Sequence, residues 1–284
     1  MIYDFKYLRP FSPAYPPYPP YANPEMYMET YFWNYFRRNL RHFGQIDRQY
    51  LPVFWTTIYN DHLQVDVQQY LDALPREGKY FTIIQHDDGV HYRLPKDTIV
   101  FSASENGNGH IIPIPLIASP IPVENVVPSK DILCSFVGSM THPIRQQLFD
   151  TLSPLENFKF KHFMPWSPRI SEDRLKDFID ITQRSKFALA PRGNIMQSFR
   201  LYEILQLGTV PVIVSDTIHL PFPDVVGWND ISIVCAPQGI PLIQDRLANM
   251  PDDEYQSFLK KGKEAYDKYF TLEGMCARIA DLLY

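Results

Sequence analysis

From residue 131 onward, apolar segments of strand length alternate with segments whose apolar residues recur at helical spacing. The segments that we predict as strands are 131–137, 158–163, 186–190 and 210–214. The segments that we predict as helices are 143 onward, 172–184, 198–207 and a tail from residue 252 in two pieces. Short connections between alternating strands and helices are typical of a parallel sheet with helices on both faces. The second half of the chain is therefore expected to be a Rossmann-like α/β domain.

The first half of the chain also mixes helices with strands. We predict its helices and strands as follows: helices over 25–43 and 65–74, and strands over 51–59, 80–84, 98–102 and 110–114. Residues 120–130 are rich in proline and polar residues, which is typical of a connection between domains. We therefore expect an N-terminal Rossmann-like domain over 1–125 and a C-terminal one over 126–284, facing each other across a cleft.

Proline and tyrosine are concentrated near the N-terminus, over about residues 8–24. The whole chain of 284 residues contains 26 prolines, and 14% of its residues are aromatic. Proline at this density excludes a helix or a central strand, so this Pro/Tyr-rich arm is expected to be extended. Two interpretations remain open: the arm is a ligand for a proline-binding partner, or its tyrosines pack across the body of this protein.

Charge and cysteine content narrow the classes of protein further. The 27 Lys and Arg residues against 32 Asp and Glu give a net charge of −5, which argues against a basic surface for nucleic acid or anionic membranes. Cys134, Cys235 and Cys276 are far apart, which argues against a disulfide framework and for a reducing compartment. The sequence has neither an apolar run of membrane-spanning length nor a signal-peptide pattern, so we expect a soluble cytoplasmic protein.

The most informative segment, 185–216, is predicted to form a strand, a loop, a helix and a second strand. Arg192 and Gly193 follow the first strand, and a glycine there lets the backbone approach a ligand closely. The helix is expected to begin near Ser198, which directs its free N–H groups and its positive dipole end toward the same edge of the sheet. This arrangement is typical of a site for a phosphate group.

Charged residues surround the predicted helix start. Arg200 lies in the first turn, where the helix dipole disfavours a cation, and Glu203 lies on the same side of the helix. The second strand ends at Asp216. Arginines can hold a nucleotide diphosphate and a carboxylate can hold ribose hydroxyls. The alternative is that Arg192 and Arg200 form salt bridges with Glu203 and Asp216, and a phosphate site would then lose this support.

A second segment, 136–145, has a similar pattern. Gly138 comes near the end of a predicted strand, and Arg145 is in the first turn of the helix that follows. Turns of this kind are common, so the pattern is weak alone. Together the two segments place three arginines at helix starts along one sheet edge. The sequence contains no Asp-x-Asp pair that would clamp a diphosphate through a metal ion.

Several motifs, in one consistent order, resemble the exostosin (GT47) glycosyltransferases. The motifs are His86-Asp87-x-Gly89, Ile112-Pro113-x-Pro115, Phe136-x-Gly138, Ile144-Arg145, Pro191-Arg192-Gly193, Ser198-Phe199-Arg200-Leu201-x-Glu203, Pro211-Val212-Ile213-x-x-Asp216 and Leu220-Pro221-Phe222. The resemblance covers about residues 50–235 and is specific because the motifs occur together. The compact form without an anchor or paired cysteines is similar to the exostosin-like transferases of large algal viruses, which suggests a viral β-xylosyltransferase.

This resemblance implies a GT-B fold and an enzyme. The expected reaction is inverting transfer of a sugar from a UDP-sugar, with UDP-xylose as the first candidate, to a hydroxyl of a glycan acceptor. No metal or other cofactor is expected, because arginines and a helix dipole can stabilise the departing diphosphate. The other interpretation is a catalytically inactive carbohydrate-binding or assembly protein on the same fold.

The expected reaction and the positions of polar residues at predicted strand ends together indicate candidate site residues. Inversion requires a base that takes the acceptor's proton, and we expect Asp87 to be that base with His86 or Asp88 orienting it. The residues expected on the acceptor side are Tyr59, Asp61 and His62, the last two forming an alternative base cluster. The residues expected to bind the donor are Gly138, Arg145, Arg192, Ser198, Arg200, Glu203 and Asp216, with no metal ligand among them. The alternative for 86–89 is an ordinary turn with solvated carboxylates.

Overall fold

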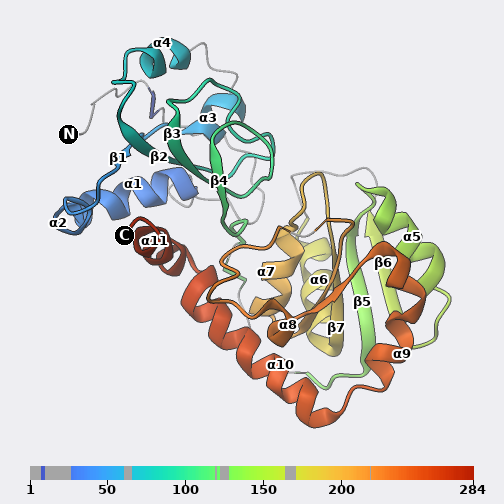
Figure 1. Ribbon diagram of the computed structural model, residues 1–284. Coiled ribbons are helices and arrows are strands. Elements are labelled where there is room, and N and C mark those ends of the chain that lie inside the picture. The colour runs from blue at the N-terminus through green and yellow to red at the C-terminus, as the bar shows by residue number, and fades with distance from the viewer. Residues whose placement is uncertain are drawn as a thin grey trace. The chain divides into compact units, whose positions relative to one another are not determined.

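The computed structural model describes residues 8–9, 27–60, 66–118, 120–121, 128–163, 171–217 and 219–284. Asp61, His62 and most of the predicted Pro/Tyr-rich arm lie outside these described residues. The chain divides into two compact units. Figure 1 labels their helices and strands and colours the chain by residue number. The first unit comprises Met1–Ile117 and Tyr269–Tyr284, and the second comprises Ala118–Lys268.

The first unit is built on a four-stranded parallel sheet with the order β1-β2-β3-β4. Its strands are β1 (Gln49–Tyr50), β2 (Lys79–Ile84), β3 (Asp97–Ser102) and β4 (His110–Pro113). Its helices are α1 (Met28–Arg38), α2 (Leu40–Phe43), α3 (Trp55–Asn60), α4 (Val67–Asp72) and α11 (Leu272–Asp281). The three strands predicted over 80–84, 98–102 and 110–114 are confirmed.

Both faces of this sheet are buried. Apolar residues from α3 and α4 pack in one cluster with alternate residues of β2, including Tyr80 and Ile84. The intervening residue Phe81 lies on the other face, where its ring stacks on Tyr50 at a centroid distance of 4.9 Å and meets Phe32 of α1 edge-on at 6.1 Å. A parallel sheet covered on both faces is the arrangement expected of a Rossmann-like domain.

The predicted strand over 51–59 is wrong. In this segment of the chain the strand β1 ends at Tyr50, and residues Trp55–Asn60 form the helix α3. The β-branched and aromatic residues of this segment favour a strand locally, but tertiary contacts override that preference. The Trp55 indole N–H donates to Thr82 Oγ1 at 2.8 Å. The carboxylate of Glu29 accepts the backbone N–H of Thr56 at 3.1 Å, in the first turn of α3.

The second unit is built on a five-stranded parallel sheet with the order β6-β5-β7-β8-β9. Its strands are β5 (Ile132–Ser139), β6 (Phe158–Phe163), β7 (Ser185–Pro191), β8 (Val210–Val214) and β9 (Ile233–Cys235). Its helices are α5 (Pro143–Leu152), α6 (Glu172–Arg184), α7 (Phe199–Gln206), α8 (Trp228–Ile231), η4 (Pro237–Leu242), α9 (Ile243–Ala248) and α10 (Asp252–Ala265). Within the described ranges, no helix has both the length and the apolar character needed to span a bilayer.

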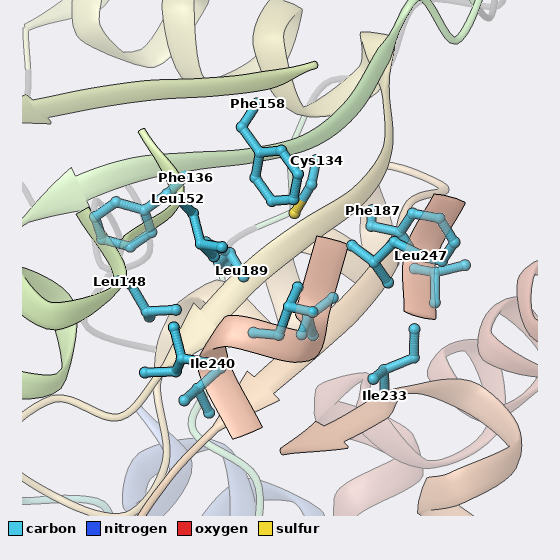
Figure 2. Close-up of a cluster of buried hydrophobic side chains, with 14 of the residues drawn as sticks. Cys134, Phe136, Leu148, Leu152, Phe158, Phe187, Leu189, Ile233, Ile240 and Leu247 are labelled. Atoms are coloured by element: carbon cyan, nitrogen blue, oxygen red, sulfur yellow. The ribbon is translucent and has the colours of Figure 1, made fainter. Parts of the chain in front are cut away.

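Side chains from alternate positions of the central strands form two separate cores. Figure 2 shows the larger core, in which Cys134 and Phe136 of β5 and Leu189 of β7 pack against Leu148 of α5. The next residue of β5, Val137, belongs instead to a cluster with α6 on the opposite face. Helices therefore cover both faces of the parallel sheet. The predicted GT-B class, with two Rossmann-like α/β domains, is confirmed in the architecture of each unit.

The C-terminal segment differs from the predicted domain division, which assigned all of 126–284 to one domain. After α10 the chain forms a π-helical turn at Tyr266–Phe270, and α11 then belongs to the first unit. Met275, Cys276 and Ile279 of α11 are fully buried. The hydroxyl of Tyr31 on α1 donates to the Glu273 carboxylate at 2.9 Å. Apolar packing on α1 therefore decides to which unit this helix belongs.

Candidate functional site

The order of strands in the second unit indicates one place for a ligand, at the carboxyl ends of two central strands. The chain leaves β5 toward β6 on one side and, later, leaves β7 toward β8 on the other. In open α/β sheets, ligands bind outside the carboxyl ends of the two strands between which the order reverses. Here those ends are Ser139 of β5 and Pro191 of β7. The donor-binding residues predicted from the sequence lie around this switch point or on the helices that begin beside it.

Arg145 is buried at the switch point, and its guanidinium binds the protein's own backbone. It donates through Nη1 to the carbonyl of Ser139 at 2.8 Å, through Nε to that of Arg192 at 3.1 Å and through Nη2 to that of Pro191 at 3.3 Å. A Cβ added at Gly193 would lie 3.3 Å from the Arg145 Nη2. The close approach that this glycine permits is therefore to Arg145, which ties the ends of β5 and β7 together instead of presenting a free cation.

Arg200, predicted as a phosphate ligand, is also bound within the protein. Its Nε donates to the Val137 carbonyl at 2.7 Å, its guanidinium carbon lies 3.9 Å from the centre of the Phe178 ring, and it forms an ion pair with Glu203. The Arg200 and Glu203 side chains are only 16% and 10% exposed. A Cβ added at Gly138 would lie 3.8 Å from the Arg200 Nε. For this pair the structure has the salt bridge that the sequence left open as the alternative.

Arg192 forms a different kind of ion pair. Its Nη1 donates to Asp216 Oδ1 at 2.6 Å and to Thr217 Oγ1 at 3.3 Å. The Arg192 side chain is 13% exposed, but that of Asp216 is 52% exposed. The hydrogen bond from Arg192 lowers the pKa of Asp216 below its ordinary value. This pair also matches the salt-bridge alternative. Its acid, Asp216, is in contact with water, so another anion can replace it on Arg192.

Ser198 is the N-cap of α7, as the sequence predicts. Its Oγ accepts the backbone N–H of Arg200 at 3.3 Å, and its backbone is extended with φ −143°. The hydroxyl therefore satisfies one of the free N–H groups at the start of this helix.

His142 lies at the same edge and was missed by the sequence analysis. It is the N-cap of α5, and its Nδ1 accepts the backbone N–H of Ile144 at 3.3 Å. Burial lowers the pKa of His142, the charges of Arg192 and Arg145 lower it further, and Asp216 opposes them. A polar residue directly before a proline that begins a predicted helix is an N-cap signal, which could have identified this position.

In the first unit, the predicted catalytic segment forms a hydrogen-bonded turn after β2. The His86 carbonyl accepts the Gly89 N–H at 3.0 Å, and Gly89 has a φ of 68°, which suits glycine. The Asp87 carbonyl accepts from Ser104 Oγ at 2.5 Å and from Asn106 Nδ2 at 3.0 Å. The ordinary turn that the sequence analysis gives as the alternative for 86–89 is therefore present, and the neutral side chains of Ser104 and Asn106 hold its backbone in place.

The side chains of this turn form a small charged group. His86 Nδ1 accepts the backbone N–H of Asp88 at 3.2 Å, so that a neutral His86 ring carries its proton on Nε2. Burial lowers the pKa of His86. The Asp88 carboxylate is 62% exposed and lies 3.7 Å from His86 Nδ1 and 3.8 Å from His91 Nε2. His91 was not expected to join this group.

Tyr59, predicted on the acceptor side, is brought next to this turn. It lies at the end of α3, its ring meets His86 edge-on at 5.1 Å, and it lies nearly parallel to the ring of Tyr92 at 6.4 Å. Its hydroxyl oxygen accepts the backbone N–H of His91 at 3.2 Å. Burial raises the pKa of Tyr59 to about 12. Residues that are 27 positions apart in sequence thus form one polar and aromatic surface.

Comparison with known families gives a match that includes both the turn at 86–89 and the switch point of the second unit. The Exostosin GT47 domain matches residues 80–250, which is more than half of the chain. The matched range begins in β2 and includes the turn at 86–89 and the carboxyl ends of β5, β7 and β8. In the described residues, no group of three or more His, Cys, Asp or Glu side chains is arranged to hold a metal ion.

Individual relatives match over shorter segments. A probable glucuronosyltransferase of Oryza sativa subsp. japonica is 36% identical over 99 residues, which are 35% of this chain and 22% of that protein. An exostosin-1 homolog of Caenorhabditis elegans is 32% identical over 93 residues, which are 33% of this chain and 24% of that protein. The matched segment thus spans about a quarter of the length of these relatives. Among solved structures, a sucrose-phosphate synthase from Thermosynechococcus elongatus aligns over 90% of this chain and 77% of that one, with a TM-score of 0.46 and 11% identity.

Proposed function

This chain belongs to the exostosin GT47 family, and on that premise we propose that it is a glycosyltransferase that moves a sugar from a nucleotide-sugar to a hydroxyl of a glycan. The observation that carries the proposal is the family match over residues 80–250, which includes both candidate sites. One relative is named a probable glucuronosyltransferase, a sugar-transferring enzyme, and another is an exostosin-1 homolog.

The donor diphosphate binds at the switch point of the second unit, with Arg192 as its principal cation. The Arg192–Asp216 pair is the one most easily exchanged, because Asp216 is 52% exposed and ion pairs in contact with water contribute only about 0–1 kcal/mol. A phosphate oxygen can take the place of the Asp216 carboxylate at little cost. Asp216 then borders the donor.

The other predicted donor residues support this position indirectly. Arg145 fixes the loops that carry Ser139 and Arg192, and Arg200 fixes the end of β5 through the Val137 carbonyl. Breaking the Arg200–Glu203 pair to bind a ligand would leave a mostly buried charge without its partner, which costs free energy. We therefore assign Arg145, Arg200 and Glu203 to holding the site's shape and not to contact with phosphate or ribose.

For the chemical step, we propose direct displacement with inversion, with UDP-xylose as the first donor to test and with no metal ion required. Asp87 is the base that removes the acceptor's proton, and the position of its backbone is fixed by Ser104 and Asn106. His86 serves as a hydrogen-bond donor through Nε2, because its Nδ1 is already an acceptor. Tyr59 offers an aromatic face for an acceptor sugar.

The experiment measures UDP release from UDP-xylose with a panel of glycan acceptors in the presence of EDTA. Asp87→Asn is expected to lower kcat by at least about 10²-fold and to leave the affinity for UDP unchanged. Glu77→Gln is the matched control, because Glu77 is an exposed carboxylate of the same unit. It should have wild-type kcat.

Each outcome has a definite meaning. Wild-type turnover by Asp87→Asn contradicts the assignment of the base. Loss of turnover in EDTA, restored by a divalent cation, contradicts a metal-independent reaction. A wild-type protein that binds glycans but transfers no sugar from any UDP-, GDP-, dTDP- or CMP-sugar would instead be the inactive carbohydrate-binding protein.

A further inference from the structure

His142 lies close to Arg192, the residue proposed to bind the donor's phosphate. It lies three residues beyond the last residue of β5, Ser139, while Arg192 directly follows β7. One guanidinium, that of Arg145, donates to the carbonyls of both Ser139 and Arg192. A Cβ added at Gly193 would lie 4.0 Å from the Oγ1 of Thr141, the neighbour of His142. The two loops that carry His142 and Arg192 are therefore held side by side.

The hydrogen bonding of His142 determines which ring nitrogen carries the proton. Its Nδ1 accepts the backbone N–H of Ile144 at 3.3 Å, so a neutral ring has its proton on Nε2. Nε2 makes no hydrogen bond to any part of the chain that the structure describes. The groups that act electrostatically on the ring are Arg192, Arg145 and Asp216, and burial together with the two arginines keeps its pKa low. The side chain therefore offers a neutral N–H donor beside a cation.

Helix capping alone does not account for a histidine at this position. Asn, Asp, Ser and Thr are the preferred N-cap residues. The other helices with a side-chain cap in the described part of the chain use such residues: Asp66, Ser171, Ser198 and Thr271. A residue that only capped α5 could be replaced by asparagine without loss.

We infer that His142 is a donor-binding residue, whose Nε2–H donates a hydrogen bond to a phosphate oxygen of the nucleotide-sugar beside Arg192. This inference rests on the proposed function, since it requires a nucleotide diphosphate at the switch point. The bond is made to an anion, and bonds of that kind are the stronger ones. Arg192 supplies the charge, and His142 supplies a second donor without adding a repelling cation.

Two variants separate binding from capping. His142→Asn keeps a good N-cap and removes the donor at the distance of Nε2, whereas His142→Gln keeps an N–H donor at a similar reach and weakens the cap. The measurements are the Kd of UDP by isothermal titration calorimetry and the Tm of the unliganded full chain. Gln146→Ala, an exposed position on the same helix, is the control.

The expected results follow opposite orders. His142→Asn should keep or raise the Tm and weaken UDP binding by about tenfold or more, the loss typical of a hydrogen bond to a charged group. His142→Gln should lower the Tm and weaken UDP binding less than His142→Asn does. Gln146→Ala should bind UDP as the wild type does.

Two results would overturn the inference while leaving the proposed function intact. One is wild-type UDP affinity in His142→Asn, and the other is affinity that simply follows the Tm across the variants, as a purely structural role requires. If instead the wild-type chain binds neither UDP nor any other nucleotide diphosphate, the donor site itself fails, and the inference fails with it.

Discussion

Hydrogen bonds from side chains to backbone carbonyls hold both the turn after β2 in the first unit and the switch point in the second, but the donors differ in charge. In the first, the Asp87 carbonyl is held by the neutral side chains of Ser104 and Asn106. In the second, backbone carbonyls are held by the guanidinium groups of Arg145 and Arg200. Each region also contains a histidine whose Nδ1 accepts the backbone N–H of the residue two positions later.

This comparison shows that arginines at a sheet edge need not be ligands for an anion. Of the three arginines that the sequence places at this edge, Arg145 binds backbone carbonyls. Arg200 binds the Val137 carbonyl and the mostly buried acid Glu203. Arg192 pairs with Asp216, an acid in contact with water. The energetic role of each arginine thus depends on the exposure of its partner.

The largest expected effect comes from removing the buried brace of the switch point. Arg145→Ala leaves the carbonyls of Ser139, Pro191 and Arg192 without their charged donor, and we expect it to lower the free energy of unfolding by about 4 kcal/mol. Urea unfolding measures this loss. Arg145→Lys should be intermediate, since its ammonium cannot donate in the same planar fork. A loss below about 1 kcal/mol for Arg145→Ala would contradict the bracing role.

The Arg200–Glu203 and Arg192–Asp216 ion pairs should contribute differently to the stability of the fold. Glu203→Gln leaves the Arg200 charge mostly buried without its partner, and we expect a loss of about 2 kcal/mol. Asp216→Asn, in the pair that meets water, should cost less than about 1 kcal/mol. Chemical denaturation of both variants in one buffer makes the comparison. Equal losses would show that exposure does not distinguish the pairs.

A smaller effect is expected in the first unit. Asn106→Ala removes one neutral hydrogen bond to the Asp87 carbonyl, which Ser104 still holds, so the expected loss is about 1 kcal/mol. The kcat measured under conditions where the variant is fully folded should also fall, because the turn carries the proposed base Asp87. A variant with unchanged kcat would show that this brace does not position Asp87.

The smallest effect concerns the feature that both regions share. Burial lowers the pKa values of His86 and His142 in the folded chain. The unfolded chain therefore binds more protons below the ordinary histidine pKa of about 6.5, and the free energy of unfolding should fall as the pH drops from there through the folded-state values. His86→Asn and His142→Asn should each flatten this slope between about pH 6.5 and 5. Unfolding curves across that range test this, and an unchanged slope would contradict the shifts.

Parts of the fold were predictable because local periodicity determined them. The predicted segments 158–163, 172–184 and 210–214 coincide with β6, α6 and β8. In contrast, α3 was predicted as a strand, since its helical conformation depends on Glu29 and Thr82, which are distant in sequence. The position of α11 in the first unit depends on burial against α1, which no local pattern encodes.

For the candidate site, local sequence patterns were enough to predict the order of strands and helices and to place Arg192, Arg200 and Ser198 at one sheet edge. Strand alternation and helix capping act over a few residues, so they can be read from neighbouring positions. The hydrogen-bond partners of these arginines could be identified only in the folded chain. Arg145 binds the carbonyl of Arg192, 47 positions away, and Arg192 binds Asp216, 24 positions away. Which acceptor an arginine finds, and whether water reaches that acceptor, depends on packing between distant segments.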